Sequence, residues 1–164
     1  MLSRRQFAYG MIVVAAGTAA ASAGGLFGLF GPADAPVGRI YAPEGIALGG
    51  TDPVAYFTEG RPVPGDAAIT ADWAGATWRF SSAENRDRFL ADPAAHAPQY
   101  GGWCAWAVAE HGSLAPTSPA AWSIVDGKLY LNYDANIQAR WDKDRPGFIS
   151  RADERWPETA ANSS

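Results

Sequence analysis

The sequence predicts a small single domain of the α+β class, in which short antiparallel hairpins pack against several helices. Its 164 residues are close to the commonest size of one domain, and the composition is not that of a disordered chain or a repeat array. Short apolar or alternating runs are separated by Gly, Pro and Asp-Gly turn signals, which is typical of hairpins. Between and after these runs, apolar residues recur at helical spacing.

The first half of the domain is expected to begin with a strand and a hairpin. A short apolar strand is predicted over 54–57, directly after Asp52-Pro53. Residues 69–73 and 77–80 alternate around Ala74-Gly75, which predicts a hairpin turn between them.

A helix is expected after this hairpin. Ser81 and Glu84 stand at the spacing of an N-cap and the third helical residue, so the helix should run over 82–91 and stop before Pro93. Its predicted core anchors are Phe89 and Leu90.

The strongest local prediction is a second hairpin, with strands 122–125 and 128–131 on either side of Asp126-Gly127. A two-residue turn pairs Ile124 with Leu129 and Trp122 with Leu131, which puts these four apolar residues on one face. Ser123, Lys128 and Tyr130 take the other face.

Three further helices are expected. One opens at Gly101-Gly102 and continues through Val108 to Gly112, and two more cover 136–142 and 148–156, separated by Pro146. The apolar residues of the last two recur at the spacing of a buried stripe, and most of the seven tryptophans are expected in the core. The stripe residues are Ile137, Trp141, Ile149, Ala152 and Trp156.

The N-terminus has the features of an export signal over residues 1–23. Paired Arg4-Arg5 precede an uncharged stretch that ends in Ala21-Ser22-Ala23, a small-x-small cleavage site, and this resembles a twin-arginine leader. We therefore expect a periplasmic or otherwise exported domain that uses the twin-arginine export machinery. This export route resembles one used by proteins that fold before they cross the membrane, often because a cofactor is loaded in the cytoplasm. The leader therefore favours a protein with a bound cofactor.

Two alternatives remain for this segment. One is an ordinary secretory signal with a basic start. The other is an uncleaved membrane anchor, because no charge occurs between Arg5 and Asp34. For the rest of the chain, we expect residues 24–45 to be a flexible lead-in, 46–157 the folded domain and 158–164 a disordered tail.

Charge and cysteine content exclude several classes of function. The net charge is −4 and becomes more negative when Arg4 and Arg5 leave with the signal. Without a cluster of basic residues, the domain gains no favourable binding energy from the phosphate groups of nucleic acids or lipids. Nucleic acid binding and peripheral membrane binding are therefore excluded. The chain has one cysteine, Cys104, so its fold is built without a disulfide.

Five segments resemble the exported branch of the YHS-domain family, with coverage from about Ile46 to Pro157. They are DPVAYF at 52–57, WRFSSAEN at 78–85, DP at 92–93, PQYGGWCA at 98–105 and DGKLYLN at 126–132.

The resemblance implies heavy-metal handling in the wider family, whose metal-binding members carry cysteines in two of these segments. The corresponding positions here are Ala55, Ser81 and Asn85, and no Tyr-His-Ser triplet is present. The chain thus resembles the family in fold but lacks the thiolates that soft metals prefer, which argues against the family's usual metal site.

Cys104 is the residue on which the functional question depends. In the first turn of its predicted helix, free N–H groups and the helix dipole favour a thiolate. The alternative is a small buried hydrophobe between Trp103 and Trp106.

Other candidate ligands are few. Asp52, before Pro53, and His96 are candidate metal ligands together with Cys104, although turn bonding and packing are alternative roles for them. His111 lies about 10 Å of helical rise from Cys104 and suits helix-end stabilisation. A pocket next to Cys104 is expected to be lined by Tyr56, Tyr100 and Trp103.

These observations favour a non-catalytic binding module that holds a metal ion, such as copper or zinc, or a small ligand near Cys104. No hydrolase, zincin, dinucleotide or phosphate-loop motif occurs, which argues against an enzyme. One alternative is a redox thiol that acts through an intermolecular disulfide or a sulfenic acid. Another is a protein-interaction domain without ligand. The partner class stays open between a small ligand, an exported protein and a second copy of the chain.

Overall fold

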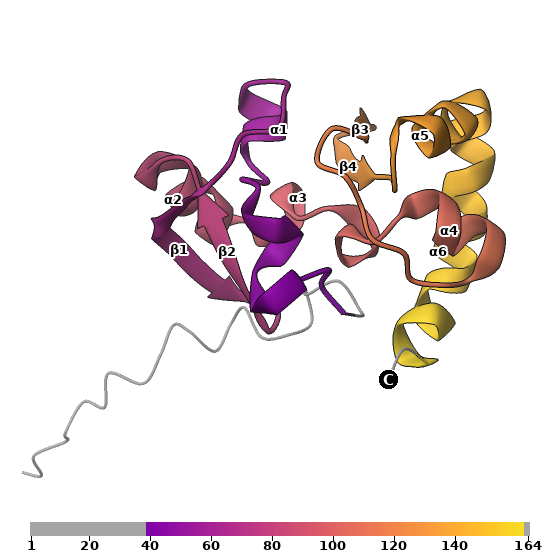
Figure 1. The fold of residues 1–164 in the computed structure, drawn as a ribbon, viewed down its shortest axis with the longest axis horizontal. Helices are drawn as coiled ribbons and strands as arrows, with labels where there is room; N and C mark the ends of the chain where they lie inside the picture. The colour runs from indigo at the N-terminus through magenta and orange to yellow at the C-terminus, as the bar shows by residue number, and fades with distance from the viewer. Residues whose placement is uncertain (1–38, 163–164) are drawn as a thin grey trace, which may run out of the picture. The chain divides into compact units, whose positions relative to one another are not determined.

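The computed structural model describes residues 39–162, which form an α+β domain as the sequence predicts (Figure 1). The predicted export signal, residues 24–38 of the lead-in and residues 163–164 lie outside the described residues. No helix within 39–162 is long and apolar enough to cross a membrane. The elements in chain order are η3 Pro43–Gly45, η4 Ala47–Gly50, α1 Ala55–Thr58, β1 Asp66–Trp73, β2 Ala76–Phe80, α2 Ala83–Ala91, α3 Pro93–His96, η5 Gln99–Gly102, α4 Ala105–His111, β3 Trp122–Val125, β4 Lys128–Leu131, α5 Ala135–Trp141, η6 Asp142–Asp144 and α6 Arg145–Asn162.

Both predicted hairpins are confirmed. In the first, Trp73 pairs with Ala76 across the turn residues Ala74 and Gly75, whose φ values of 51° and 79° are those of a type I′ turn. In the second, Ile124 pairs with Leu129 and Trp122 with Leu131, which is the predicted register. Figure 1 shows that each hairpin is followed directly by a helix, α2 or α5.

The second hairpin lies between two hydrophobic clusters. One face, with Leu129 and Leu131, belongs to a cluster that includes Trp78, Phe80 and Phe89. Tyr130 on the opposite face belongs to a cluster built around α4, α5 and α6. Both faces of this two-stranded sheet are therefore covered. Trp141 and Trp156 are buried as predicted, and so is Trp78. The other four tryptophans are only half-buried against the clusters, namely Trp73, Trp103, Trp106 and Trp122.

The predicted strand over 54–57 is wrong, because these residues begin the short helix α1. A run of four apolar residues carries no period that separates strand from helix. Here the Asp52 carboxylate accepts hydrogen bonds from the N–H groups of Val54 and Ala55 and so holds the first helical turn.

The start of α2 differs by one residue from the prediction. Ser82, not Ser81, is the N-cap, and its hydroxyl accepts a hydrogen bond from the N–H of Asn85. Phe89 is a core anchor as predicted, but Leu90 is 51% exposed because consecutive helical residues point about 100° apart.

The helix after Gly101-Gly102 also starts later than predicted. Tyr100, Gly101 and Gly102 have positive φ values of 56°, 62° and 86°, which interrupt a helix, and α4 begins at Ala105. A side chain at position 101 would collide with the carbonyl oxygen of Arg39. The predicted end at Gly112, which adopts the left-handed conformation, is confirmed.

The folded domain is longer at both ends than 46–157. Ile40 is buried in the first cluster and the N–H of Tyr41 bonds to Gly101, so residues 39–45 are not a flexible lead-in. At the other end, α6 includes Pro146 in its first turn, where proline is tolerated, and continues to Asn162. The predicted tail is therefore helical over 158–162.

Candidate functional site

Cys104 is the buried N-cap of α4 and is 1% exposed. Its Sγ donates a weak hydrogen bond to Oδ1 of Asn132 at 3.7 Å. The same oxygen accepts the N–H of Trp106 at 3.1 Å. The thiol therefore lies between the start of a helix and the end of the second hairpin.

Burial raises the pKa of the Cys104 thiol, and the charge of Asp134 adds a smaller push in the same direction. The N–H groups of Ala107, Tyr133 and Trp106 act the other way but do not outweigh the burial. Of the two alternatives for Cys104, the thiolate in a first helical turn is wrong, since the residue precedes the helix and burial favours the neutral thiol. The buried small residue is the alternative that the structure shows.

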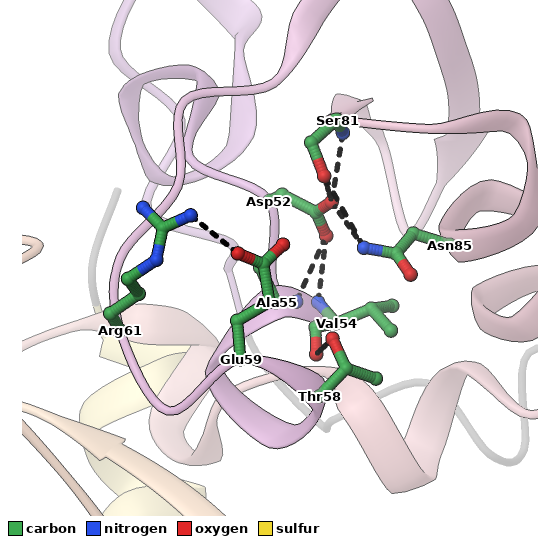
Figure 2. A network of polar contacts seen from close by, with 8 residues as sticks. All are labelled: Asp52, Val54, Ala55, Thr58, Glu59, Arg61, Ser81 and Asn85. Carbon is green, nitrogen blue, oxygen red and sulfur yellow. Dashed lines mark hydrogen bonds and ion pairs between the residues drawn. The ribbon is translucent and has the colours of Figure 1, made fainter.

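Asp52 is completely buried and accepts five hydrogen bonds, all from neutral donors (Figure 2). Its Oδ1 takes the N–H groups of Val54 and Ala55 at 2.8 and 3.3 Å. Its Oδ2 takes the N–H and hydroxyl of Ser81 at 2.8 and 2.7 Å and the side-chain amide of Asn85 at 2.8 Å. We call Asp52 and these donors the Asp52 cage. Both carboxylate oxygens are occupied by donors, so metal ligation by Asp52 would require breaking the cage.

The other predicted lining residues face different partners. The Tyr56 hydroxyl donates to the Pro119 carbonyl at 2.9 Å, and its ring belongs to the first cluster. The Tyr100 hydroxyl donates to Asp153 at 2.8 Å, and its ring belongs to the second cluster. Tyr56 and Tyr100 therefore do not share the single lining that the sequence suggested.

Trp103 and His96 are likewise held by nearby groups. The indole N–H of Trp103 donates to the Arg39 carbonyl at 2.9 Å, and its ring packs on Tyr41. His96 places Nδ1 2.9 Å from the Asp92 carbonyl oxygen, and its ring meets that of Phe57 edge-on. This contact fits the packing role that was the alternative for His96.

The predicted metal ligands Cys104, His96 and Asp52 do not form one centre. Across residues 39–162, no group of three or more His, Cys, Asp and Glu side chains is arranged to hold a metal ion.

The structure instead contains a polar hollow that sequence reasoning missed. It has a volume of about 560 Å³ and lies where the C-terminal end of α4 meets the last turns of α6. We call it the α4–α6 hollow. Its lining residues are Glu110, His111, Gly112, Ser113, Leu114, Arg155, Glu158, Thr159 and Asn162.

Its walls are held by contacts between the two helices. Arg155 on α6 donates to the Ala109 carbonyl at 2.6 Å, and Arg151 on α6 pairs with Glu110 at 3.1 Å. Within α4, the His111 ring meets the Trp106 ring edge-on. The feature of the sequence that could have indicated this hollow is His111 next to Gly112, which predicted only the end of a helix. On the opposite wall, Arg155 belongs to the predicted helix 148–156, whereas Glu158, Thr159 and Asn162 fall in the segment predicted to be a disordered tail.

A second hollow, of about 530 Å³, lies at the turn of the first hairpin and is lined mainly by turn residues with Trp73 and Asp72. The Asp72 carboxylate already accepts the Thr77 hydroxyl at 2.7 Å, so this hollow offers little free polar chemistry.

No family model, curated protein or solved structure matches the chain. What the protein does must therefore be inferred from its own residues.

Proposed function

We propose that this protein is an exported, non-catalytic binding module of the YHS type that takes a small polar molecule into the α4–α6 hollow. The observation that carries the proposal is the hollow itself. Its volume of about 560 Å³ lies within the range of small-molecule sites, and its walls bring charges of both signs together.

The lining favours a ligand with both an acidic and a basic group. Arg155 offers a guanidinium that suits a carboxylate, while Glu158 offers a carboxylate that suits an ammonium group. Ser113 and Asn162 add neutral donors and acceptors to the lining. An amino acid or a similar zwitterion has this combination of groups.

The chemistry of the described residues supports binding rather than redox or metal function. Cys104 is buried, and its raised pKa disfavours the thiolate that a redox thiol uses. The His, Cys, Asp and Glu side chains of residues 39–162 supply no three-ligand metal centre. A polar organic ligand is therefore the better candidate than copper or zinc.

The Asp52 cage supports the YHS resemblance. The three positions where metal-binding relatives carry cysteine are Ala55, Ser81 and Asn85, and all three donate hydrogen bonds to Asp52 (Figure 2). Residues that form one metal site in those relatives must lie close together in the fold. Ala55, Ser81 and Asn85 do lie close together here, around Asp52.

Export is supported by the twin-arginine pattern at Arg4-Arg5 and fits the single cysteine. An exposed thiol is open to oxidation outside the cytoplasm. A 1% exposed Cys104 is sheltered from it.

The binding proposal is tested by titrating the purified chain with single amino acids, acidic, basic and neutral, while following backbone amide signals by NMR. We expect saturable shifts at 110–114 and 158–162 with at least one probe. Glu158→Gln should weaken that binding at least tenfold. Glu154→Gln, on the same helix but outside the lining, should leave the affinity unchanged.

Two results would contradict the proposal. One is the absence of saturable shifts at the hollow with every probe. The other is an equal loss of affinity in Glu158→Gln and Glu154→Gln, which would mean that the effect is one of overall charge.

A further inference from the structure

Unusual backbone conformations recur along the chain at a constant offset of 52 residues. Leu48, Gly49 and Gly50 have φ values of 53°, 59° and 90°, and Tyr100, Gly101 and Gly102 have 56°, 62° and 86°. The same offset relates Gly60 to Gly112 and the hairpin turn Ala74-Gly75 to Asp126-Gly127. Among the described residues with positive φ, only Glu44 and Gly45 lack such a counterpart.

The secondary structure follows the same offset. Strands β2 and β4 begin at Ala76 and Lys128, and helices α2 and α5 begin at Ala83 and Ala135. The hairpin registers also correspond. The pair Trp73–Ala76 of the first hairpin matches the pair Val125–Lys128 of the second. The next three pairs of the first hairpin each match a pair of the second at the same offset.

Hydrogen bonds between distant parts of the chain repeat as well. The N–H of Asp52 donates to the Val63 carbonyl at 2.9 Å, and the N–H of Cys104 donates to the Ala115 carbonyl at 3.0 Å. The helix caps correspond in the same way: Ser82 accepts the N–H of Asn85, and Asp134 accepts the N–H of Ile137.

Buried residues occupy matching positions although their identities differ. Trp78 and Tyr130 are both buried on the second strand of a hairpin, and Phe89 and Trp141 are both fully buried on the helix that follows. The positions with identical residues include the turn glycines, where positive φ favours glycine. Because most matching residues differ in identity, composition and periodicity alone give little sign of the repeat.

We propose that residues 48–92 and 100–144 are two copies of one structural unit, and that Cys104 fills in the second copy the caged position that Asp52 fills in the first. Both residues stand before a helix. The N–H groups of Val54, Ala55 and Ser81 donate to Asp52, and those of Trp106, Ala107 and Tyr133, at the matching positions, lie close enough to the Cys104 thiol to lower its pKa.

The two cages differ in their side-chain donors. The Ser81 hydroxyl and Asn85 amide, which complete the Asp52 cage, correspond to Tyr133 and Ile137, whose side chains do not hydrogen-bond to Cys104. With fewer donors a neutral thiol fits better than a carboxylate, because a buried charge needs every lone pair occupied. Cys104 is thus a structural replacement for a carboxylate, and this assignment does not depend on any ligand in the α4–α6 hollow.

The equivalence is tested by building the first copy's cage into the second. In Cys104→Asp with Tyr133→Ser and Ile137→Asn, the new donors should offset the repulsion between the carboxylate and the facing acceptor Asn132 Oδ1, so we expect a folded chain with one cooperative unfolding transition. The matched control moves the carboxylate by one residue: Ala105→Asp with the same two partner changes. Ala105 is fully buried outside the cage, so this control should lose its folded signal.

Equal loss of folding in the two triple variants would overturn the proposal. A second measurement on the unaltered chain keeps the test independent of variant folding. Intraresidue amide-to-Hα NOEs report positive φ, and they should be strong at Leu48 and Tyr100 and at Ala74 and Asp126. A weak NOE in either member of these pairs would contradict the repeat.

Discussion

At the scale of single residues, Asp52 is the group on which the first half of the domain most depends. Its side chain joins the start of α1, the end of β2 and the first turns of α2 through five hydrogen bonds. A buried carboxylate is stable only when its lone pairs are occupied, and here neutral donors alone occupy them.

Replacing Asp52 with Asn should lower the free energy of unfolding by about 2–4 kcal/mol. In the variant, an NH2 group would take the place of Oδ2 and would face hydrogen-bond donors. The N–H of Ser81 and the side-chain amide of Asn85 would then lose their acceptor. Urea unfolding followed by tryptophan fluorescence measures the change.

The matched control for this change is Asp66→Asn. Asp66 also accepts a backbone N–H two residues later, that of Ala68, but it is exposed, so its loss should stay within about 0.5 kcal/mol. Equal losses in the two variants would mean that burial of the cage contributes nothing.

Cys104 makes the stability of the domain depend on alkaline pH. Burial raises the pKa of its thiol in the folded state, so the folded chain binds the proton more tightly than the unfolded chain. This contribution is complete below the ordinary thiol pKa of about 8.5 and is lost as the pH rises above it.

We expect the unfolding midpoint of the wild-type chain to fall between about pH 8 and 10, and Cys104→Ala to show a flatter profile over that window. Burial also raises the pKa of Tyr130 to about 12, so both chains should lose further stability above about pH 10. Urea midpoints at half-unit pH steps provide the measurement. Parallel profiles for the two chains would show that the thiol is not the titrating group.

At the scale of elements, the two hairpin turns share one backbone conformation but differ in sequence. The first central residue is Ala74 in one turn and Asp126 in the other, with φ values of 51° and 50°. Alanine at positive φ is strained, whereas Asp and Asn tolerate this conformation. The first turn is therefore the less favourable of the two.

Ala74→Asn should stabilise the domain by about 1 kcal/mol, and the reciprocal Asp126→Ala should destabilise it by a similar amount. Both side chains are exposed, so packing changes little. Thermal unfolding of the two variants beside the wild type checks the signs. A drop in midpoint for Ala74→Asn would rule out strain at this turn.

At the scale of the whole described molecule, α6 closes the second cluster. It packs along α4 and contributes Ala152, Trp156 and Ala160 to that cluster (Figure 1). Because α4 is short, much of its burial depends on α6 rather than on helix propensity.

Ending the chain at Asp144 should therefore remove the cooperative unfolding transition, since it exposes Ala105, Val108 and Ala109 of α4 to water. Near-ultraviolet circular dichroism and a urea titration measure the loss. Removing only residues 163–164 is the control and should leave the midpoint unchanged. A shortened chain with a wild-type midpoint would show that α6 is dispensable.

Much of the fold could be predicted because its signals are local. Asp126-Gly127 and the alternation around it specify a turn and a register within ten residues, and the predicted pairs were confirmed. The errors fall where a distant contact competes with a local signal. Ser81 has the spacing of a cap but bonds to Asp52, so Ser82 caps α2 instead.

The candidate site was less predictable, because it depends on which surfaces meet. His111 was correctly placed near a helix end, but the wall that faces it consists of Arg155 and of residues from 158–162, a segment that was predicted to be a tail. A terminal segment without strong periodicity becomes helical here through burial of Thr159 and Ala160.

The α+β class, both hairpins and the register of the second one could be predicted from the amino-acid sequence. The burial of Cys104, the Asp52 cage and the polar hollow between α4 and α6 emerge only in the folded molecule. The difference lies in the distance along the chain between the groups that interact. Turns and registers follow from backbone bonds between near neighbours, whereas burial and the pKa of a thiol depend on residues brought together across the whole fold.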